Sequence, residues 1–258
     1  MSFIAADSSG AVGHGRAPAA KRIAIVQSNY IPWIGYFDLI RRVDEFVLFD
    51  DVQFTKRDWR NRNLIKTPDG LRWLTIPVVT KGRYTQRICD VEISDENWAR
   101  RHWLAIAGAY GRAPGFADAV AALEPFFLGL QTEPRLSGVN RALLTALCPL
   151  LGLATPLRWS MDYGGHQVDG RGAKTERLVA ICRAADATHY LSGPAARAYL
   201  DEASFAAAGI TVEWMDYSHY RPYRQLHGPF ERGVSVIDVL AHLGRDAAAY
   251  LHGLDMAA

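Results

Sequence analysis

Short apolar runs of strand length alternate with helix-like segments near the start of the chain. Residues 22–27 and 45–50 are largely apolar stretches next to polar residues, a pattern typical of strands buried on both faces of a sheet. A loop over residues 28–35 and a short helix over residues 36–43 separate them. This order of strand, helix and strand predicts a βαβ unit.

The same alternation resumes near residue 155. The pattern predicts strands over residues 155–160, 188–192 and 210–215, and helices over residues 172–185, 194–208 and 235–243. Together with the βαβ unit, this alternation predicts an α/β fold, a Rossmann-like three-layer sandwich with a mostly parallel sheet.

The middle of the chain follows a different pattern. Residues 71–78 predict a strand entered through the turn Asp69-Gly70, and the alternating residues 88–93 predict a half-exposed strand. Ser94 is expected to cap a helix over residues 95–110, stopped by Gly111.

Two further helices are expected near residues 115–123 and 137–151. Because this part of the chain is rich in Ala and Leu and poor in Val and Ile, residues from about 95 to 151 are expected to form a central helical insertion. Residues 21–258 then form a single domain. Residues 1–20, rich in Ala, Gly and Ser, are expected to be a disordered leader.

Composition excludes two protein classes. The 258 residues are 49% hydrophobic and carry a net charge of +2, which is unlike an intrinsically disordered chain. No apolar run approaches the roughly 20 residues of a membrane span. The three cysteines lie scattered within apolar stretches, so neither a disulfide scaffold nor a zinc site is expected, and a reduced, cytoplasmic setting fits best.

Charge is distributed unevenly along the chain. Residues 56–87, the basic segment, hold nine basic residues against Asp58 and Asp69, a charge of +7, whereas the rest holds 20 basic and 25 acidic residues. Ligands of open α/β sheets bind at the carboxyl ends of strands, and the basic segment follows such an end. Since arginine forks match phosphate and carboxylate oxygens, an anionic small molecule is the expected partner.

Two other interpretations of the basic segment stay open. It could be a solvated loop whose charges pair with acids elsewhere, although Gln53, Trp59, Asn61, Asn63 and Trp73 add hydrogen-bonding groups and flat stacking surfaces. Nucleic acid is a weaker candidate, because the whole protein is barely basic and lacks a recognisable nucleic-acid motif.

Polar side chains at strand ends supply the candidate catalytic residues. Gln27 ends the first strand, where it either projects into the crevice or caps the loop. Asp50 and Asp51 end the second strand and should point to opposite sides; they could bind a divalent metal, act as a general base, or pair with Lys56 and Arg57. The candidate catalytic residues are Gln27, Asp50, Asp51 and Lys56.

Candidate substrate-binding residues come from loops at the same expected edge. Gly35 stands at a helix entry, and Ser192-Gly193 leads into another helix, where free N–H groups can receive an anion. The set comprises Tyr30, Trp33, Gly35, Arg57, Arg60, Asn61, Arg62, Ser192, Gly193, Asp216 and Tyr223. No GxGxxG, Walker, HExxH or GxSxG motif is present, so no cofactor is identified, no metal ligand is predicted and a conventional hydrolase triad is not expected.

Several segments resemble the WbqC-like protein family. The matching blocks are AIVQSNYIPWIGYFD at residues 24–38, FDDVQFTKRDWRNRN at 49–63, YLSGPAARAYL at 190–200 and SVIDVL at 235–240. The resemblance extends from Arg22 to about Gly244, and the block DDVQF-x-KR is very specific.

The resemblance implies a biosynthetic role. Family members are associated with bacterial surface-polysaccharide (lipopolysaccharide O-antigen) and specialised-metabolite gene clusters. The implied activity is a group transferase, acyl or aminoacyl, that acts on an amino-bearing precursor such as an amino sugar or amino acid. A nucleotide sugar or acyl donor would present the anion that the basic segment is expected to bind.

Two alternatives remain. The chain is distantly similar to the HIGH-motif nucleotidyltransferases and pantoate ligases, but Trp33 and Tyr36 stand where two histidines would stabilise the phosphate transition state. An adenylating enzyme is therefore one alternative. The other is a non-catalytic protein that binds a precursor and delivers it to a partner enzyme.

Overall fold

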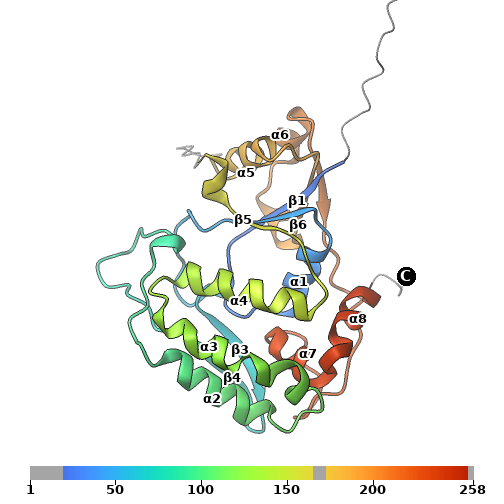
Figure 1. Ribbon diagram of the computed structural model, residues 1–258. Coiled ribbons are helices and arrows are strands. Elements are labelled where there is room, and N and C mark those ends of the chain that lie inside the picture. The colour runs from blue at the N-terminus through green and yellow to red at the C-terminus, as the bar shows by residue number, and fades with distance from the viewer. Residues whose placement is uncertain (1–19, 165–172, 255–258) are drawn as a thin grey trace, which may run out of the picture.

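Five parallel strands form the central sheet of the computed structural model, which describes residues 20–164 and 173–254. The strands are β1 (Arg22–Val26), β2 (Glu45–Leu48), β5 (Leu157–Trp159), β6 (His189–Ser192) and β7 (Thr211–Trp214), in the order β5-β2-β1-β6-β7 (Figure 1). Every pair is parallel. The Rossmann-like α/β prediction is confirmed; the leader expected over residues 1–20 lies, except for Ala20, outside the described residues.

One face of the sheet is covered by α5 (Ala173–Ala184) and α6 (Glu202–Ala207) (Figure 1). Ile23, Ile25 and Val47 point to this face and share a buried cluster with both helices. Within the cluster, Phe205 of α6 stacks on Tyr190 with 4.9 Å between ring centroids.

The opposite face is covered by α1 (Ile34–Arg41) and α4 (Leu136–Leu150) (Figure 1). Ala24, Phe46 and Leu48 face this side and belong to a larger buried cluster. Because both faces of β1 and β2 are covered, these strands need apolar residues on both sides, which explains the continuous apolar runs.

The strand order reverses beside β1. From β1 the chain passes to β2 and then β5 on one side, and it crosses back to β6 and β7 on the other side. Loops that leave β1 and β6 therefore diverge at their carboxyl ends, which is where open α/β sheets accept ligands.

A hairpin of β3 (Arg62–Thr67) and β4 (Gly70–Thr75) packs below the sheet (Figure 1). The strand expected over residues 71–78 is confirmed in part, and Gly70 turns with φ 108°. The first strand was not predicted, because its basic residues obscure an alternation in which Asn63 and Ile65 are buried.

Helical segments follow one another over residues 98–150, the part of the chain for which a helical insertion is expected. They are α2 (Trp98–Tyr110), η2 (Phe116–Val120, a π-helix), η3 (Ala121–Leu123), α3 (Glu124–Gly129), η4 (Leu130–Thr132) and α4. The expected cap at Ser94 is wrong, because α2 begins after Asn97. The N–H of Asn97 donates to Asp95 Oδ1 at 2.8 Å, so residues 95–97 form a turn before the helix.

The strand expected over residues 88–93 is also wrong. A 3₁₀ turn, η1 (Ile88–Asp90), replaces it, and Ile88 and Val91 are both fully buried. Backbone bonds from Ile88 and Cys89 to the carbonyls of Val52 and Asp50 hold this turn against the end of β2. Buried side chains three residues apart in this turn thus give a sequence pattern that resembles the alternation of a half-exposed strand.

The remaining elements are short. They are η5 (Ser160–Tyr163), η6 (Pro194–Ala198), α7 (Val236–Leu243), η7 (Gly244–Asp246) and α8 (Ala247–His252). The single helix expected over residues 194–208 is divided, because the side chain of Asp201 accepts the N–H of Ala203 at 3.1 Å and starts α6 separately. Among the described residues, no helix has the length and apolar character that a bilayer crossing requires.

Replacing Phe205 with alanine tests the packing of the layer above the sheet. Phe205 is fully buried, so Phe205→Ala should lower the free energy of unfolding by about 3–5 kcal/mol in urea denaturation. Phe126 of α3 is 39% exposed, and Phe126→Ala, the control, should lower it by less than about 1 kcal/mol. Equal losses would contradict this packing.

Candidate functional site

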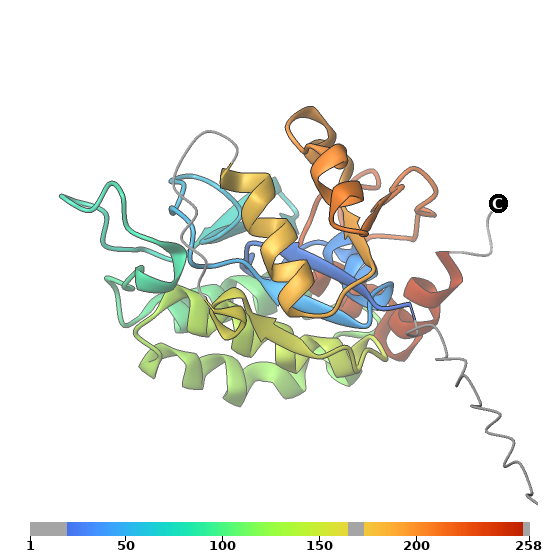
Figure 2. The ribbon, with the colours of Figure 1, turned by 90° about the horizontal axis from the view of Figure 1, so that it is seen from above.

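A cavity of about 550 Å³ opens at the carboxyl ends of β1, β2 and β6. Gln27, Phe49 and Ser192 come from the three strand ends, and α5 lies over β1 and β2 beside it (Figure 2). The other lining residues are Ile25, Val26, Val52, Gln53, Thr55, Arg60, Lys174, Leu178, Tyr190, Gly193, Ala195, Ala196 and Tyr199. The cavity, named here the switch-point cavity, occupies the place where the strand order reverses.

Arg60 of the basic segment reaches the end of β1. Its guanidinium donates to Gln27 Oε1 and, at 2.7 Å, to Asn29 Oδ1. Asp58 lies 3.4 Å from the same guanidinium, whose side chain is only 15% exposed. The basic segment thus folds over the sheet edge and brings Arg60, Gln27 and Ser192 to one cavity.

A buried polar network supports this arrangement from below. Asn140 Nδ2 donates to the carbonyl oxygen of Arg60 and to Ser28 Oγ, both at 2.9 Å. The N–H of Ser28 donates to Asp50 Oδ1 at 2.8 Å, and Ser137 Oγ donates to Asp50 Oδ2. Since Ser137 and Asn140 are three residues apart, they share one face of α4. The network connects β1, β2, α4 and the basic segment.

Asp50 lies inside this network and outside the list of cavity-lining residues. It is fully buried, and both carboxylate oxygens accept hydrogen bonds from the protein. Burial raises the pKa of Asp50, while the bonds from Ser137 and Ser28 and the charge of Arg60 act in the opposite direction. This geometry suits a residue that holds two strand ends to α4.

Asp51 points to the other side and joins a second contact. Its oxygens accept from Ser160 Oγ at 2.5 Å and from Arg177 Nη2 at 2.6 Å. The Arg177 guanidinium also lies 4.9 Å from the ring centre of Phe49, a lining residue. Asp51 therefore ties the end of β2 to η5 and α5 and fixes one wall of the cavity.

The charged groups that line the switch-point cavity are basic. They are Arg60 and Lys174, whose Nζ lies 5.8 Å from the ring centre of Tyr199. Two cations and the hydrogen-bonding groups of Gln27 and Ser192 form a suitable site for phosphate or carboxylate oxygens.

An adjoining cavity of about 340 Å³ contains Lys56. It shares Gln53 and Thr55 with the switch-point cavity and is also lined by Phe54, Arg83, Tyr84 and Gln86. Arg57 and Arg62 lie outside both sets of lining residues. The backbone of Arg57 is left-handed, with φ 59°, and its carbonyl oxygen accepts from Arg62 Nη2.

Asn61 has a structural position. It is buried, and its Nδ2 donates to the carbonyl oxygen of Ile76 at 2.8 Å, while its own carbonyl accepts the N–H of Ile76. These bonds join the two ends of the β3–β4 hairpin.

The loop before α1 points away from the cavity. Trp33 packs against Tyr217, with ring centroids 5.0 Å apart, and a Cβ on Gly35 would lie 2.3 Å from the Trp33 ring. Tyr30 is fully buried, and its hydroxyl lies 2.8 Å from His102 Nδ1. Tyr30, Trp33 and Gly35 therefore pack on the α1 side and do not line the switch-point cavity.

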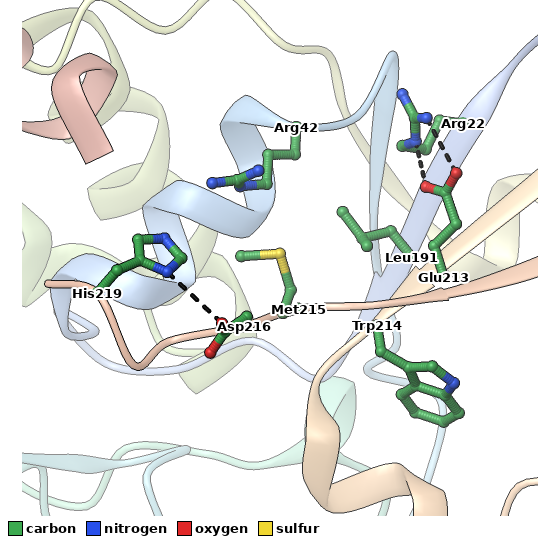
Figure 3. A pocket seen from close by; sticks show the side chains of 8 residues that line it. All are labelled: Arg22, Arg42, Leu191, Glu213, Trp214, Met215, Asp216 and His219. Atoms are coloured by element: carbon green, nitrogen blue, oxygen red, sulfur yellow. Dashed lines mark hydrogen bonds and ion pairs between the residues drawn. The ribbon is translucent and has the colours of Figure 1, made fainter. Parts of the chain in front are cut away.

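Asp216 lines a separate cavity of about 470 Å³ beside β7 (Figure 3). Leu191 and Met215, which form part of its lining, belong to the cluster on the α1 face of the sheet, opposite to Tyr190. Its charged groups are paired: Arg22 Nε lies 2.5 Å from Glu213, Arg42 Nε lies 3.1 Å from Asp38, and Asp216 lies 3.7 Å from His219. This cavity is therefore less suited to binding an anion than the switch-point cavity is.

Tyr223 belongs to a buried cluster between the hairpin and α7. Its hydroxyl donates to Asp238 Oδ1 at 2.7 Å, and Gln225 Nε2 donates to the same oxygen at 2.8 Å. Lys66 Nζ donates to Gln225 Oε1 at 2.6 Å. Burial and Asp238 raise the pKa of Tyr223. Tyr223 thus lies apart from the switch-point cavity.

Three groups in and around the site were missed from the sequence. Lys174 lies near the start of a predicted helix. Because that helix begins at the carboxyl edge of the sheet, the predicted topology could have indicated that its first residues lie near the site. Ser137 and Asn140 are polar residues three apart on an otherwise apolar helix face, which indicates a buried network. Within the described parts of the chain, no group of three or more His, Cys, Asp or Glu side chains could hold a metal ion.

Comparisons with known proteins agree with the resemblance seen in the sequence. A profile of the WbqC-like protein family matches residues 27–250. Uncharacterized protein Rv1507c of Mycobacterium tuberculosis (strain ATCC 25618 / H37Rv) is 51% identical over 231 residues, which cover 90% of this chain and 97% of the relative. No solved structure matches the chain.

His102, the partner of Tyr30, should give stability a specific pH dependence. Its Nε2 lies 3.2 Å from the carbonyl oxygen of Thr75, so Nε2 carries the proton and Nδ1 accepts from Tyr30. Burial lowers the pKa of His102 to about 4. The unfolded chain binds a proton near pH 6.5 and the folded chain only near 4, so up to about 3 kcal/mol of stability should be lost as pH falls through this window.

Urea denaturation across that pH range tests this. The free energy of unfolding of the wild type should fall more steeply between pH 6.5 and 4 than that of His102→Gln. His252→Gln, at an exposed position in α8, should keep the wild-type slope. Parallel curves for the wild type and His102→Gln would show that His102 is not held neutral.

Proposed function

This chain belongs to the WbqC-like protein family, and on that premise we propose that it is a biosynthetic transferase that moves an acyl or aminoacyl group to an amino-bearing precursor. The precursor would be an amino sugar or amino acid in surface-polysaccharide or specialised-metabolite synthesis. The anionic substrate, either an acyl donor or a nucleotide sugar that carries the amino group, would bear a phosphate or carboxylate. The site of action would be the switch-point cavity.

One observation carries the proposal: the charged lining residues of the cavity, Arg60 and Lys174, are both basic. Arg60 is preorganised, because Gln27, Asn29 and Asp58 hold its guanidinium. In this proposal the two cations bind the anionic part of the donor and neutralise the charge that develops on the leaving group.

The transfer itself requires a neutral amine. Its nitrogen lone pair would form the new bond to the acyl carbon, while the bond to the leaving group breaks and that group departs with the electron pair. Gln27 Oε1 and Ser192 Oγ would accept hydrogen bonds from the amine, whose surplus proton passes to water. Asp50 and Asp51 would hold the walls, since both already accept hydrogen bonds from the protein.

The outer basic residues would extend this site. Lys56 lines the adjoining cavity, which shares Gln53 and Thr55 with the switch-point cavity. We assign Lys56 to a second anionic group of the donor. Arg57 and Arg62 would raise the local positive potential and attract the donor to the edge of the sheet.

Binding without turnover is a second candidate function. None of the described residues that line the switch-point cavity is His, Cys, Asp or Glu, the residue types that most often transfer protons or attack substrates. A protein that binds a precursor and passes it to an enzyme would need the two cations for binding and would not need a catalytic acid, base or nucleophile. No comparable observation favours adenylation, because the loop that holds Trp33 and the start of α1 faces away from the cavity.

Variants of the two cations test the proposal. Arg60→Ala and Lys174→Ala should each weaken the binding of pyrophosphate about tenfold in calorimetric titrations, because each removes a charge-assisted hydrogen bond. Arg112→Ala, at an exposed turn after α2, is the matched control and should bind as the wild type does. Wild-type affinity in both cavity variants would reject the cavity as the anion site.

Turnover separates the two candidate functions. Purified protein is incubated with acyl and aminoacyl donors and with amino-sugar acceptors, free and nucleotide-linked, and mass spectrometry follows the acceptor. A mass increase equal to the transferred group, lost in Lys174→Ala, is the expected result for a transferase. Donor binding without any modified acceptor across the panel would favour the binding protein.

A further inference from the structure

Two tryptophans and a leucine lie exposed on the outer surface of the basic segment. Trp59 is 41% exposed, Trp73 is 42% exposed and Leu71 is 49% exposed. The rings of Trp59 and Trp73 lie 5.3 Å apart and are tilted by 43°. These three residues, with Arg62, form what is called here the aromatic platform.

The hairpin does not need these rings for its own packing. In β4, Leu74 is buried, whereas Leu71 and Trp73 alternate with it on the exposed side. Its partner β3 buries Asn63 and Ile65 on the inner side. On the outer face, Lys66 is buried against Gln225 and Pro229, whereas Leu71 and Trp73 stay exposed. A cluster of exposed apolar groups often marks a binding site.

The platform is positively charged. The Arg62 guanidinium lies 4.1 Å from the centre of the Trp73 ring, a cation–π contact that keeps the charge beside the indole. The carbonyl of Arg57 holds Arg62 Nη2, and Arg57 is itself exposed. A ligand that stacks here meets cations at its edge.

One turn of the chain links the platform to the switch-point cavity. Trp59 contributes its ring to the platform, and the next residue, Arg60, contributes its guanidinium to the cavity. Their Cα atoms are about 3.8 Å apart. The carbonyl of Trp59 accepts the N–H of Tyr30 at 3.0 Å, which fixes this turn against the loop after β1. The platform and the cavity thus begin at adjacent residues of the chain.

The size of the platform indicates a single ring or two rings. Trp59 and Trp73 together expose roughly 200 Å² of surface, if a whole tryptophan offers about 250 Å². A stable protein interface needs about 800 Å² from each partner. The exposed area thus fits a nucleobase or a pyranose and falls well short of a protein surface.

We propose that the aromatic platform binds a flat-faced ring of the anionic substrate, while the phosphate linked to that ring reaches the switch-point cavity. This inference rests on the proposed anion site in that cavity and adds the substrate class to it. A nucleobase and a pyranose share the required chemistry, a ring with an apolar face attached to phosphate. The ring stacks on Trp59 and Trp73, and Arg62 contacts its polar edge or phosphate.

Calorimetric titrations with three probes test the platform. Uridine diphosphate supplies a base with phosphates, glucose 1-phosphate supplies a pyranose with a phosphate, and pyrophosphate supplies the anion without a ring. Trp59→Leu and Trp73→Leu should each weaken at least one ring-bearing probe about tenfold, and leave pyrophosphate affinity within about twofold of the wild type. Which ring-bearing probe responds identifies the ring.

Trp214 offers a matched control. It also carries an arginine over its ring, with Arg197 Cζ 5.0 Å from the ring centre, but it lies on β7 beside the cavity of Figure 3. Trp214→Leu should bind all three probes as the wild type does. Retained pyrophosphate affinity in the platform variants shows that these variants are folded.

The outcomes separate this inference from the cavity proposal. Failure of both ring-bearing probes to bind at millimolar concentration, or unchanged affinity in both platform variants, overturns the platform. Unchanged pyrophosphate affinity in Arg60→Ala and Lys174→Ala overturns the cavity proposal, whatever the platform variants do. Loss of pyrophosphate affinity in the platform variants also overturns the division into ring and anion sites.

Discussion

The site depends on a buried carboxylate that joins two strand ends to a helix. Asp50 accepts the N–H of Ser28 from the end of β1 and the hydroxyl of Ser137 from α4. Asn140, one turn further along α4, extends the network to the backbone of Arg60. Buried polar groups are stable only when they are paired, so the contacts of Asp50 constrain where the basic segment can lie.

That constraint divides the basic segment by function. Arg60 is held over the end of β1 and faces the switch-point cavity, while Trp59 and Arg62 face outward on the hairpin. Asp51 stabilises the opposite wall through Arg177. The same pair of adjacent aspartates thus supports both sides of the cavity, because neighbouring side chains at a strand end leave in opposite directions.

The sheet could be predicted from the sequence because long apolar runs report two-sided burial directly. The strand-end rule predicts that Gln27 and Ser192 lie at one edge, since parallel strands share one carboxyl edge, and both line the switch-point cavity with Arg60. The rule does not say which face of the sheet a loop will cover. Trp33 and Asp216 follow strand ends as Ser192 does, yet Trp33 packs on the α1 face and the exposed Asp216 lines the cavity beside β7.

Other features could not be predicted because local patterns are ambiguous. In β3, Arg62, Asn63 and Lys66 are polar although Asn63 and Lys66 are buried, so that a strand resembled a polar loop. Ile88 and Val91 are buried in a 3₁₀ turn whose register depends on the carbonyls of Asp50 and Val52. The roles of Ser137 and Asn140 depend on residues more than 80 positions away, which no local pattern contains.

A crystal structure of the protein soaked with pyrophosphate tests the central claim most directly. The account predicts phosphate density between Arg60 and Lys174, within hydrogen-bond reach of Ser192, with the Arg60 guanidinium still bound to Gln27. Density instead at Arg42 and His219, in the cavity of Figure 3, or an empty switch-point cavity beside an ordered anion elsewhere, would contradict it.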